Sequence, residues 1–422
     1  MKKLSLVFLC LIIFLPVLSQ EKPDRMQWFA DARLGIFIHW GIYAVNGIDE
    51  SWSFYNGYIS HDDYMKQMDG FTGKNYDPEA WADLISESGA HYAVITSKHH
   101  DGVALWPTKC TELHLSKDYL KPFVQALRKR NIKAGLYFSL LDWSHPDYPS
   151  FTRKEKRYEK DSTRWSRFVD FNFCQINELL DKYNPDLWWF DGDWEQSAEA
   201  WQAPLIRETI LAYNPQAIMN SRLQGYGDYA TPEQGIPIHK PTDTYWELCM
   251  TMNDSWGYQQ NDKNYKTPNQ VIRILAECIS MGGNLLLDIG PRADGSIPEE
   301  QVEILKALGR WTGKHAEAIY GTRAGIPANY FYGPSALSAD KKTLYLYLDG
   351  KPNGPIMLKG LKNKINRIWV VGNGTKLNYD IKMKQYWSSV PGIVYIDVPE
   401  DVLDEQLTVI AVLLDGEIDL HE

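Results

Sequence analysis

The chain has 422 residues, with 44 basic and 54 acidic side chains and a formal net charge of −10 at pH 7. It contains no long basic run, so we expect neither nucleic acid nor an anionic lipid surface as a partner, whereas a neutral substrate such as a sugar fits this charge. The length predicts two domains, one large and one small.

The first 19 residues have the pattern of a secretory signal peptide. Lys2 and Lys3 precede an almost wholly apolar run over 4–15, and Val17-Leu18-Ser19 supplies a small-residue cleavage site. The run is shorter than the roughly 20 residues that a membrane-spanning helix needs. We therefore expect an exported chain, periplasmic or secreted, with no stable membrane insertion.

Residues 20–323 alternate short apolar runs with amphipathic stretches. Turn residues bound each run, and the runs are apolar on both faces, as strands buried in a parallel sheet are. The seven runs lie at 35–40, 91–97, 133–139, 186–190, 217–221, 244–249 and 284–289.

Helical patterns occupy the segments between these runs. The first is well delimited, since Asp77 can cap it, Pro78 suits its first position and Gly89 can stop it. The others lie at 119–130, 166–183, 198–213, 269–281 and 299–320. Repeated strand–helix units predict a parallel sheet, and seven or eight units that close on themselves form a (β/α)8-like, TIM-type barrel. An open doubly wound sheet is the alternative, although no Gly-rich phosphate loop follows the first strand.

The pattern changes after residue 323, where β-rich runs are joined by Gly, Asn, Asp and Pro. These runs lie at 343–348, 356–358, 368–371, 394–398 and 407–414. They predict a C-terminal β-sandwich over 324–422.

Four cysteines remain after the predicted cleavage, and their spacings match no zinc or redox motif. Cys174, Cys249 and Cys278 lie in apolar segments, which favours buried free thiols. One disulfide, involving any of these or Cys110, stays open as the alternative in an oxidising compartment.

Polar and aromatic side chains gather just after the predicted strands, where barrel enzymes carry their chemistry. They include His39, Glu50 and Trp52 after the first run, Lys98-His99-His100-Asp101 after the second, Asp142 and Trp143 after the third, Asp191 at the end of the fourth, Arg222 and Glu233 after the fifth, and Glu247 and Trp256 in and after the sixth.

Asp191 is the strongest single candidate for a catalytic residue among them. It emerges from a packed strand, the following Gly192 permits a tight turn, and a second carboxyl nearby could protonate a leaving oxygen. Such a carboxyl pair is what glycosidases use. The alternative for Asp191 is a helix cap or a loop salt bridge.

The histidines could also be metal ligands. Adjacent side chains on a strand point to opposite faces, so we expect His99 and His100 to diverge, which makes a shared ion awkward. No His-Glu-x-x-His or His-x-His pattern accompanies them. We therefore expect no metal, and neutral imidazoles that hydrogen-bond sugar hydroxyls or fill the core.

At these motifs the chain resembles the α-L-fucosidases of glycoside hydrolase family 29. The resemblance is carried by Gly35-Ile36-Phe37-Ile38-His39-Trp40-Gly41, Ser97-Lys98-His99-His100-Asp101-Gly102, Gly135-Leu136-Tyr137, Trp189-Phe190-Asp191-Gly192, Trp246-Glu247 and Gly282-Gly283-Asn284. It implies a catalytic barrel followed by a β-sandwich, and a retaining double displacement without cofactor.

The resemblance also implies roles for single residues. Asp191 matches the nucleophile, and Glu233 best matches the acid/base, with Glu247 as runner-up; retention predicts carboxyls about 5–5.5 Å apart. The matched fucose-pocket positions are His39, Glu50, Trp52, His99, His100, Tyr137, Trp189, Arg222 and Trp256.

The implied function is hydrolysis of terminal α-L-fucosyl residues from a fucosylated oligosaccharide or glycoconjugate. Three rivals stay open: a non-catalytic carbohydrate-binding protein, a metal-dependent hydrolase that uses the histidines, and a retaining hydrolase for another sugar. The sequence leaves the fucosidic linkage open.

Overall fold

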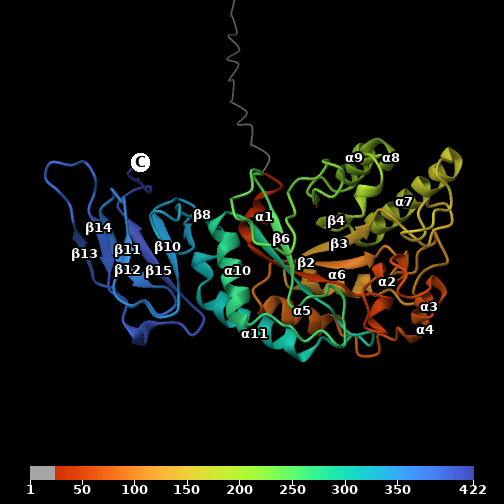
Figure 1. The fold of residues 1–422 in the computed structure, drawn as a ribbon, viewed down its shortest axis with the longest axis horizontal. Helices are drawn as coiled ribbons and strands as arrows, with labels where there is room; N and C mark the ends of the chain where they lie inside the picture. Colours follow the sequence, from red (N-terminus) through yellow and green to blue (C-terminus); the bar gives the residue numbers. More distant parts are fainter. Residues whose placement is uncertain (1–23) are drawn as a thin grey trace, which may run out of the picture.

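The computed structural model describes residues 24–422, so the predicted signal peptide lies outside the described residues. A barrel of parallel strands and helices forms one end of the molecule and an antiparallel β part, drawn in blue, forms the other (Figure 1).

Seven parallel strands make one curled sheet in the order β5-β4-β3-β2-β1-β7-β6. Nearly every residue in these strands is buried, as continuous apolar runs predict. The strands are β1 (Leu34–Ile38), β2 (Tyr92–Lys98), β3 (Lys133–Ser139), β4 (Leu187–Asp191), β5 (Ile218–Met219), β6 (Glu247–Thr251) and β7 (Asn284–Ile289).

An extended segment at 229–233 fills the gap between the two edge strands, β5 and β6. Parallel bridges join Asn220 to Tyr229 on one side, and Ala230 to Trp246 and Glu233 to Cys249 on the other. This segment therefore takes the eighth position and closes the sheet. The prediction of a (β/α)8-like barrel is confirmed, with one position that lacks a regular strand, and the doubly wound alternative is wrong.

Helices pack around the outside of the barrel. The main ones are α1 (Gln27–Ala32), α5 (Pro78–Glu87), α6 (Leu120–Lys129), α7 (Ser162–Tyr183), α8 (Ala198–Trp201), α9 (Ala203–Tyr213), α10 (Pro268–Ser280) and α11 (Glu299–Lys314), with the short helices α2 (Trp52–Tyr55), α3 (His61–Met65) and α4 (Gln67–Gly70) near the pocket end. Asp77 caps α5 as predicted, accepting from the backbone N–H groups of Glu79 and Ala80. Within residues 24–422, no helix has the length and apolar character needed to cross a membrane.

The single helix predicted over 198–213 is two helices. Gln202 has a left-handed backbone (φ 54°) and separates α8 from α9. Pro204, near the start of α9, has no N–H to continue the hydrogen bonding of the preceding turn, so the chain breaks there and restarts.

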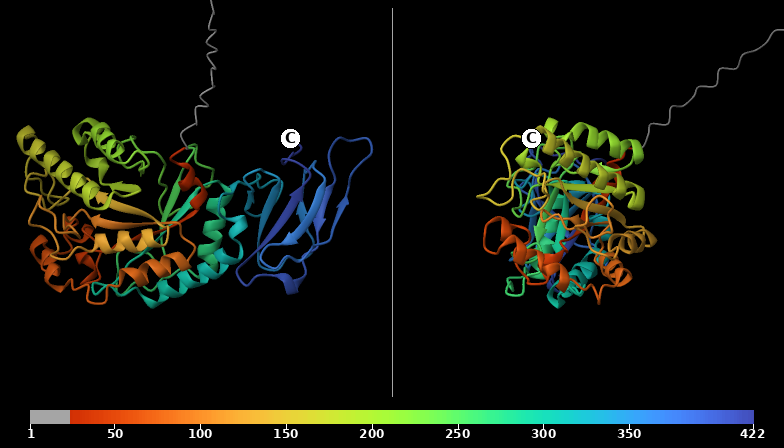
Figure 2. Two further views of the ribbon diagram at one scale, coloured as in Figure 1. Left: turned by 180° about the vertical axis from the view of Figure 1, so that it is seen from behind. Right: turned by 90° about the vertical axis from the view of Figure 1, so that its right-hand side faces the viewer.

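The C-terminal part is a β-sandwich, as predicted. Its sheets have the orders β12-β15-β10-β9-β8 and β11-β14-β13. The strands are β8 (Arg323–Ala324), β9 (Ser335–Leu337), β10 (Thr343–Asp349), β11 (Ile356–Leu358), β12 (Ile365–Val370), β13 (Tyr379–Lys382), β14 (Ile393–Ile396) and β15 (Leu407–Leu414). The sandwich packs beside α10 and α11 (Figure 2), and the indole of Trp311 donates 2.8 Å to the carbonyl of Leu407.

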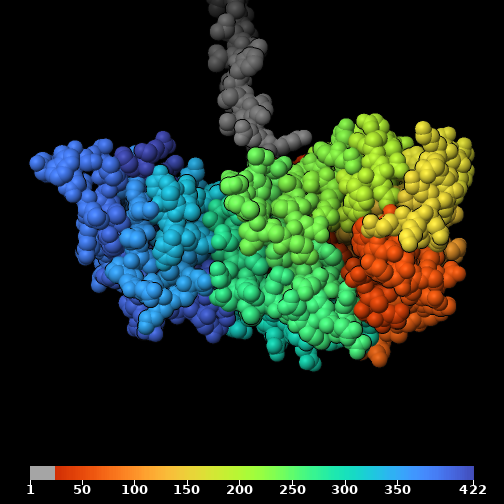
Figure 3. Space-filling view, in the orientation of Figure 1, coloured from red at the N-terminus to blue at the C-terminus, as the bar shows by residue number. Residues whose placement is uncertain are grey.

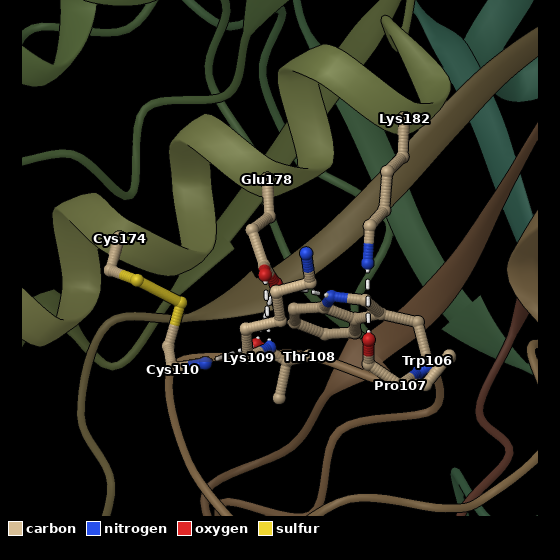
Figure 4. Close-up of a disulfide and its surroundings, with 8 residues drawn as sticks. All are labelled: Trp106, Pro107, Thr108, Lys109, Cys110, Cys174, Glu178 and Lys182. Atoms are coloured by element: carbon tan, nitrogen blue, oxygen red, sulfur yellow. Dashed lines mark hydrogen bonds between the residues drawn. A yellow bond between two sulfur atoms is a disulfide. The ribbon is translucent and has the colours of Figure 1, made fainter.

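A disulfide joins Cys110, in the loop after β2, to Cys174 on α7 (Figure 4). The expectation of a free, buried Cys174 is therefore wrong, whereas Cys249 and Cys278 are free and buried as predicted. Helical periodicity explains the error. Phe171 and Gln175 face the core, while Cys174 falls on the exposed side of α7, within reach of the loop.

Candidate active site

A cavity of about 160 Å³ opens at the C-terminal ends of the barrel strands. Its walls gather every predicted site residue except Glu247, together with two further aromatic residues. The lining consists of Phe37, His39, Glu50, Trp52, His99, His100, Tyr137, Trp189, Asp191, Trp194, Arg222, Glu233 and Trp256.

Asp191 is the last residue of β4 and lies at the floor of this cavity. Its Oδ2 accepts a hydrogen bond of 2.9 Å from the phenol of Tyr137, and its Oδ1 accepts one of 2.9 Å from Arg222 Nη1. Gly192 allows the turn that follows, because its φ is +79° and an added Cβ would lie 2.6 Å from Leu141 Cγ. The hydrogen bonds from Tyr137 and Arg222 together hold the carboxylate of Asp191 in one orientation.

Glu233 lies on the segment that closes the barrel. Its Oε2 accepts a hydrogen bond of 2.5 Å from Nη2 of Arg222, the guanidinium that also holds Asp191. That guanidinium lies 4.6 Å from the centre of the Trp189 ring. The Glu233 side chain is 41% exposed, so it is at the mouth of the cavity while Asp191 is at its floor.

Glu247, the alternative acid/base, lies outside the cavity. The predicted strand 244–249 would have placed it near a strand end, but β6 begins at Glu247, so the residue sits at the opposite end of the barrel strands. It is fully buried, and its two oxygens accept hydrogen bonds from Tyr92 and Trp189. Burial raises the pKa of Glu247 to about 7.

The three pocket histidines share one mode of anchoring, through Nδ1. His39 Nδ1 is 2.7 Å from Asp288 Oδ1, His100 Nδ1 is 2.6 Å from Ser139 Oγ, and His99 Nδ1 is hydrogen-bonded to Ser51 Oγ. The ring nitrogen that remains is Nε2 in each case, and that of His100 lies 3.6 Å from Asp191 Oδ2. Burial holds the pKa of all three imidazoles well below the ordinary value, so the rings are neutral near pH 7.

The expectation that His99 and His100 point to opposite faces is wrong. Their ring centres are 4.3 Å apart, and both rings line the cavity. The alternation rule applies within a strand, but β2 ends at Lys98, and the histidines follow in a turn. No group of three or more His, Cys, Asp or Glu side chains suited to a metal ion occurs within residues 24–422.

Glu50 and Trp52 come from the loop and short helix that follow β1. Glu50 accepts a hydrogen bond of 2.5 Å from the backbone N–H of Gly257, and burial raises its pKa to about 7 although this hydrogen bond opposes the shift. Trp52 stacks against Trp194, with ring centres 6.2 Å apart. The loops after β1 and β4 thus meet over the cavity.

Phe37 and Trp194 line the cavity, yet the sequence did not single them out as pocket residues. Phe37 lies in β1, two residues before His39, which directly follows the strand. The two-residue period of the predicted run 35–40 puts both on one face, so this signal was present in the sequence. Trp194 lies three residues after Asp191 in a single 3-10 turn, Asp193–Glu195, beyond the end of the strand, so the strand period does not reach it. Asp288, which orients His39, could be recognised only from the fold.

Comparisons with known proteins agree with this geometry. The family model described as α-L-fucosidase matches residues 16–317. Tissue α-L-fucosidase of Rattus norvegicus is 32% identical over 342 residues, covering 72% of each chain. The structure of α-L-fucosidase isoenzyme 1 from Paenibacillus thiaminolyticus superposes with a TM-score of 0.84 at 32% identity, covering 93% of this chain and 99% of that one.

A second solved structure bears on the chemistry. It is a family 29 α-L-fucosidase from Bacteroides thetaiotaomicron, described as a trapped covalent intermediate in complex with 2-fluoro-fucosyl fluoride. It has a TM-score of 0.82 and 27% identity, covering 94% of this chain and 97% of that one.

Proposed function

The chain belongs to the α-L-fucosidase family, glycoside hydrolase family 29, and we propose that its pocket hydrolyses terminal α-L-fucosyl residues by a retaining double displacement. The observation that carries this proposal is the bridge formed by Arg222. One guanidinium holds both Asp191 and Glu233 at a cavity whose other walls are neutral imidazoles, aromatic rings and the buried carboxyl group of Glu50.

In the first step, Asp191 attacks the anomeric carbon while Glu233 gives its proton to the leaving glycosidic oxygen. The bond from the sugar to the leaving group breaks, and an ester bond between Asp191 and the sugar forms. The fixed orientation of Asp191 supports its role, since a nucleophile must be held in line with the carbon it attacks. The exposure of Glu233 at the mouth supports its role, since the leaving group must lie outside the cavity.

In the second step, Glu233 takes a proton from water, which attacks the same carbon and releases Asp191. The ionised carboxylate is the form of Glu233 that this step requires. For the first step, Glu233 must carry a proton and turn from Arg222 to the glycosidic oxygen.

Sugar recognition rests on the remaining walls. The Nε2 atoms of His39, His99 and His100 are placed to hydrogen-bond hydroxyl groups, and the rings of Phe37 and Trp256 are placed to pack the apolar face and the methyl group of fucose. All these side chains are provided by the chain itself, and no metal or organic cofactor takes part in the proposed steps.

The test is hydrolysis of an aryl α-L-fucoside by wild type, Asp191→Gly and Glu233→Ala, with and without azide. Asp191→Gly should lose several orders of magnitude in rate and yield β-fucosyl azide when azide is added. Glu233→Ala should yield α-fucosyl azide. If the azide products had the opposite configurations, the two roles would have to be exchanged. Wild type that hydrolyses other aryl glycosides but not the fucoside would overturn the sugar assignment.

We also propose that the chain is exported to the periplasm or secreted. The signal-peptide pattern over 1–19 supports this, and so does the Cys110–Cys174 disulfide, because disulfides persist mainly in oxidising compartments. Mass spectrometry of the mature protein from cell fractions should find an N-terminus at Gln20. A full-length chain in the cytoplasmic fraction would contradict the proposal.

A further inference from the structure

A second, larger cavity of about 470 Å³ lies on the barrel beyond the pocket described above. One wall is the segment 54–61, which runs from α2 into α3, and the other is the loop 151–155. In Figure 3 the red-orange and yellow surfaces of these regions lie side by side at the end of the molecule away from the sandwich.

We propose that this cavity is an accessory sugar-binding groove that takes a saccharide unit of the glycan to which the fucose is attached. The proposal rests on the proposed function, because it assigns the groove to the same substrate. Three observations carry it: the mixed lining of the groove, the rigidity of its walls, and an unbroken run of aromatic rings from the groove to the mouth of the pocket.

The lining combines aromatic rings with neutral polar groups and one charge of each sign. Tyr58 is 76% exposed, which leaves its ring free to pack against a sugar. Opposite it, Lys154 and Glu155 are exposed, and within residues 24–422 neither forms an ion pair. Rings that cover apolar C–H faces, beside free donors and acceptors, suit a neutral polyhydroxylated ligand better than an anionic or a wholly apolar one.

The two walls are fastened to each other, so the groove is preformed. The backbone N–H of Arg153 donates 2.9 Å to the carbonyl of Tyr55, and Arg153 Nε donates 2.8 Å to Asn56 Oδ1. The Tyr55 ring is stacked on Trp143, with ring centres 3.8 Å apart. A preformed site loses little conformational entropy when a ligand binds.

Aromatic rings connect the groove to the pocket. Trp194 and Trp52 line the pocket and stack on each other, and Trp52 contacts Tyr55 edge-to-face at 5.7 Å between ring centres. Tyr55 is itself a wall of the groove. A glycan whose fucose occupies the pocket could therefore extend along this run and place another sugar beside Tyr58.

The test compares Tyr58→Ala and Tyr58→Phe with wild type on 4-nitrophenyl α-L-fucoside and on a series of fucosylated oligosaccharides of two to six sugars. Tyr58→Ala should leave kcat/KM on the aryl fucoside unchanged and lower it about 3- to 10-fold on the longest members, the range expected for losing one aromatic contact. Tyr58→Phe keeps the ring and should behave as wild type. The matched control is Tyr332→Ala, since Tyr332 is 62% exposed between α11 and β9, away from the pocket.

Direct binding gives a second readout. Saturation-transfer NMR with the defucosylated oligosaccharides should show binding to wild type and Tyr58→Phe that Tyr58→Ala loses. Equal kcat/KM values for wild type and Tyr58→Ala across the series would overturn the assignment of the groove as a sugar-binding site. An equal loss of kcat/KM in Tyr332→Ala would overturn it as well. Wild type inactive on the aryl fucoside would instead overturn the proposed function, so the two failures are distinguishable.

Discussion

The phenol of Tyr92 donates a hydrogen bond of 2.6 Å to Oε2 of Glu247, deep inside the barrel. The other oxygen of this carboxyl accepts a hydrogen bond of 3.0 Å from the indole of Trp189, whose ring lies beneath Arg222. Glu247 therefore holds a wall of the pocket from behind. In this respect Glu247 differs from Glu233, whose side chain lines the cavity.

The two glutamates should respond differently to the leaving group. Loss of a general acid costs about 10²–10⁴-fold when the leaving group is poor, and far less when the leaving group departs as a stable phenolate. Glu233→Ala should thus be strongly impaired on a sugar leaving group and only mildly on a dinitrophenyl fucoside. Glu247→Gln should lose a similar factor on both. Steady-state kcat/KM values across a leaving-group series measure this, and a steeper dependence for Glu247→Gln would reverse the assignment.

Glu247 should also make stability depend on pH. Its pKa is raised by burial to about 7 in the fold, against 4.5 as the ordinary value. Between these two pH values the carboxyl group of Glu247 is protonated in the folded chain and ionised in the unfolded chain. Its contribution to the free energy of unfolding is therefore complete below pH 4.5 and is lost as the pH rises through 7. Glutamine does not titrate. The free energy of unfolding of Glu247→Gln should therefore rise by about 3 kcal/mol relative to that of wild type between pH 4.5 and pH 7.5.

Urea unfolding at several pH values measures this difference. The control is Glu303→Gln, an exposed residue of α11, whose difference from wild type should stay within about 0.5 kcal/mol. If the difference in unfolding free energy between Glu247→Gln and wild type did not change with pH, the buried carboxyl group would not titrate between pH 4.5 and pH 7.5.

Arg222 should tolerate no substitution, including lysine. An ammonium keeps the charge but cannot form two parallel hydrogen bonds to separate carboxylates. Losing one charged hydrogen bond of about 1.5–3 kcal/mol predicts a fall of about 10- to 100-fold in kcat/KM for Arg222→Lys, and a larger fall for Arg222→Gln. Arg207→Lys, which removes a guanidinium that binds Asp228 outside the pocket, is the control. Near-wild-type activity of Arg222→Lys would mean that charge alone suffices.

The disulfide should stabilise the chain without affecting the pocket. It closes a loop with a sequence separation of 64, for which the loop-entropy model gives about 4 kcal/mol. Cys110→Ser/Cys174→Ser should lower the free energy of unfolding by up to this amount and leave kcat/KM on the aryl fucoside unchanged. Dithiothreitol should destabilise wild type and leave the double variant as it is, and sensitivity of the double variant would point to another disulfide.

Removal of metal ions should have no effect. The proposed mechanism uses only carboxylates, imidazoles and the guanidinium. Dialysis against EDTA should therefore leave kcat and KM on the aryl fucoside within error, and addition of Zn²⁺, Mn²⁺ or Mg²⁺ should restore nothing. Activity lost to EDTA and recovered with one of these ions would revive the metal-dependent alternative.

The sequence alone determined the features that depend on local pattern. Continuous apolar runs located the barrel strands, two of them (133–139 and 284–289) with the observed bounds, because strands buried on both faces tolerate few polar residues. Asp77 and Pro78 located the start of α5. Asp191 was predicted at a strand end, followed by a glycine that the turn requires, and the resemblance to a known family gathered the other pocket residues.

Only the tertiary structure decided the relationships between distant segments. It showed that 229–233 takes the eighth barrel position, which brings Glu233 to the mouth, and that β6 begins at Glu247, which leaves that carboxyl in the interior. It paired Cys110 with Cys174 and turned His99 and His100 toward one cavity. The physical reason is common to all of these: periodicity records which face of an element is buried, whereas the side chain that meets that face is set by packing across the fold.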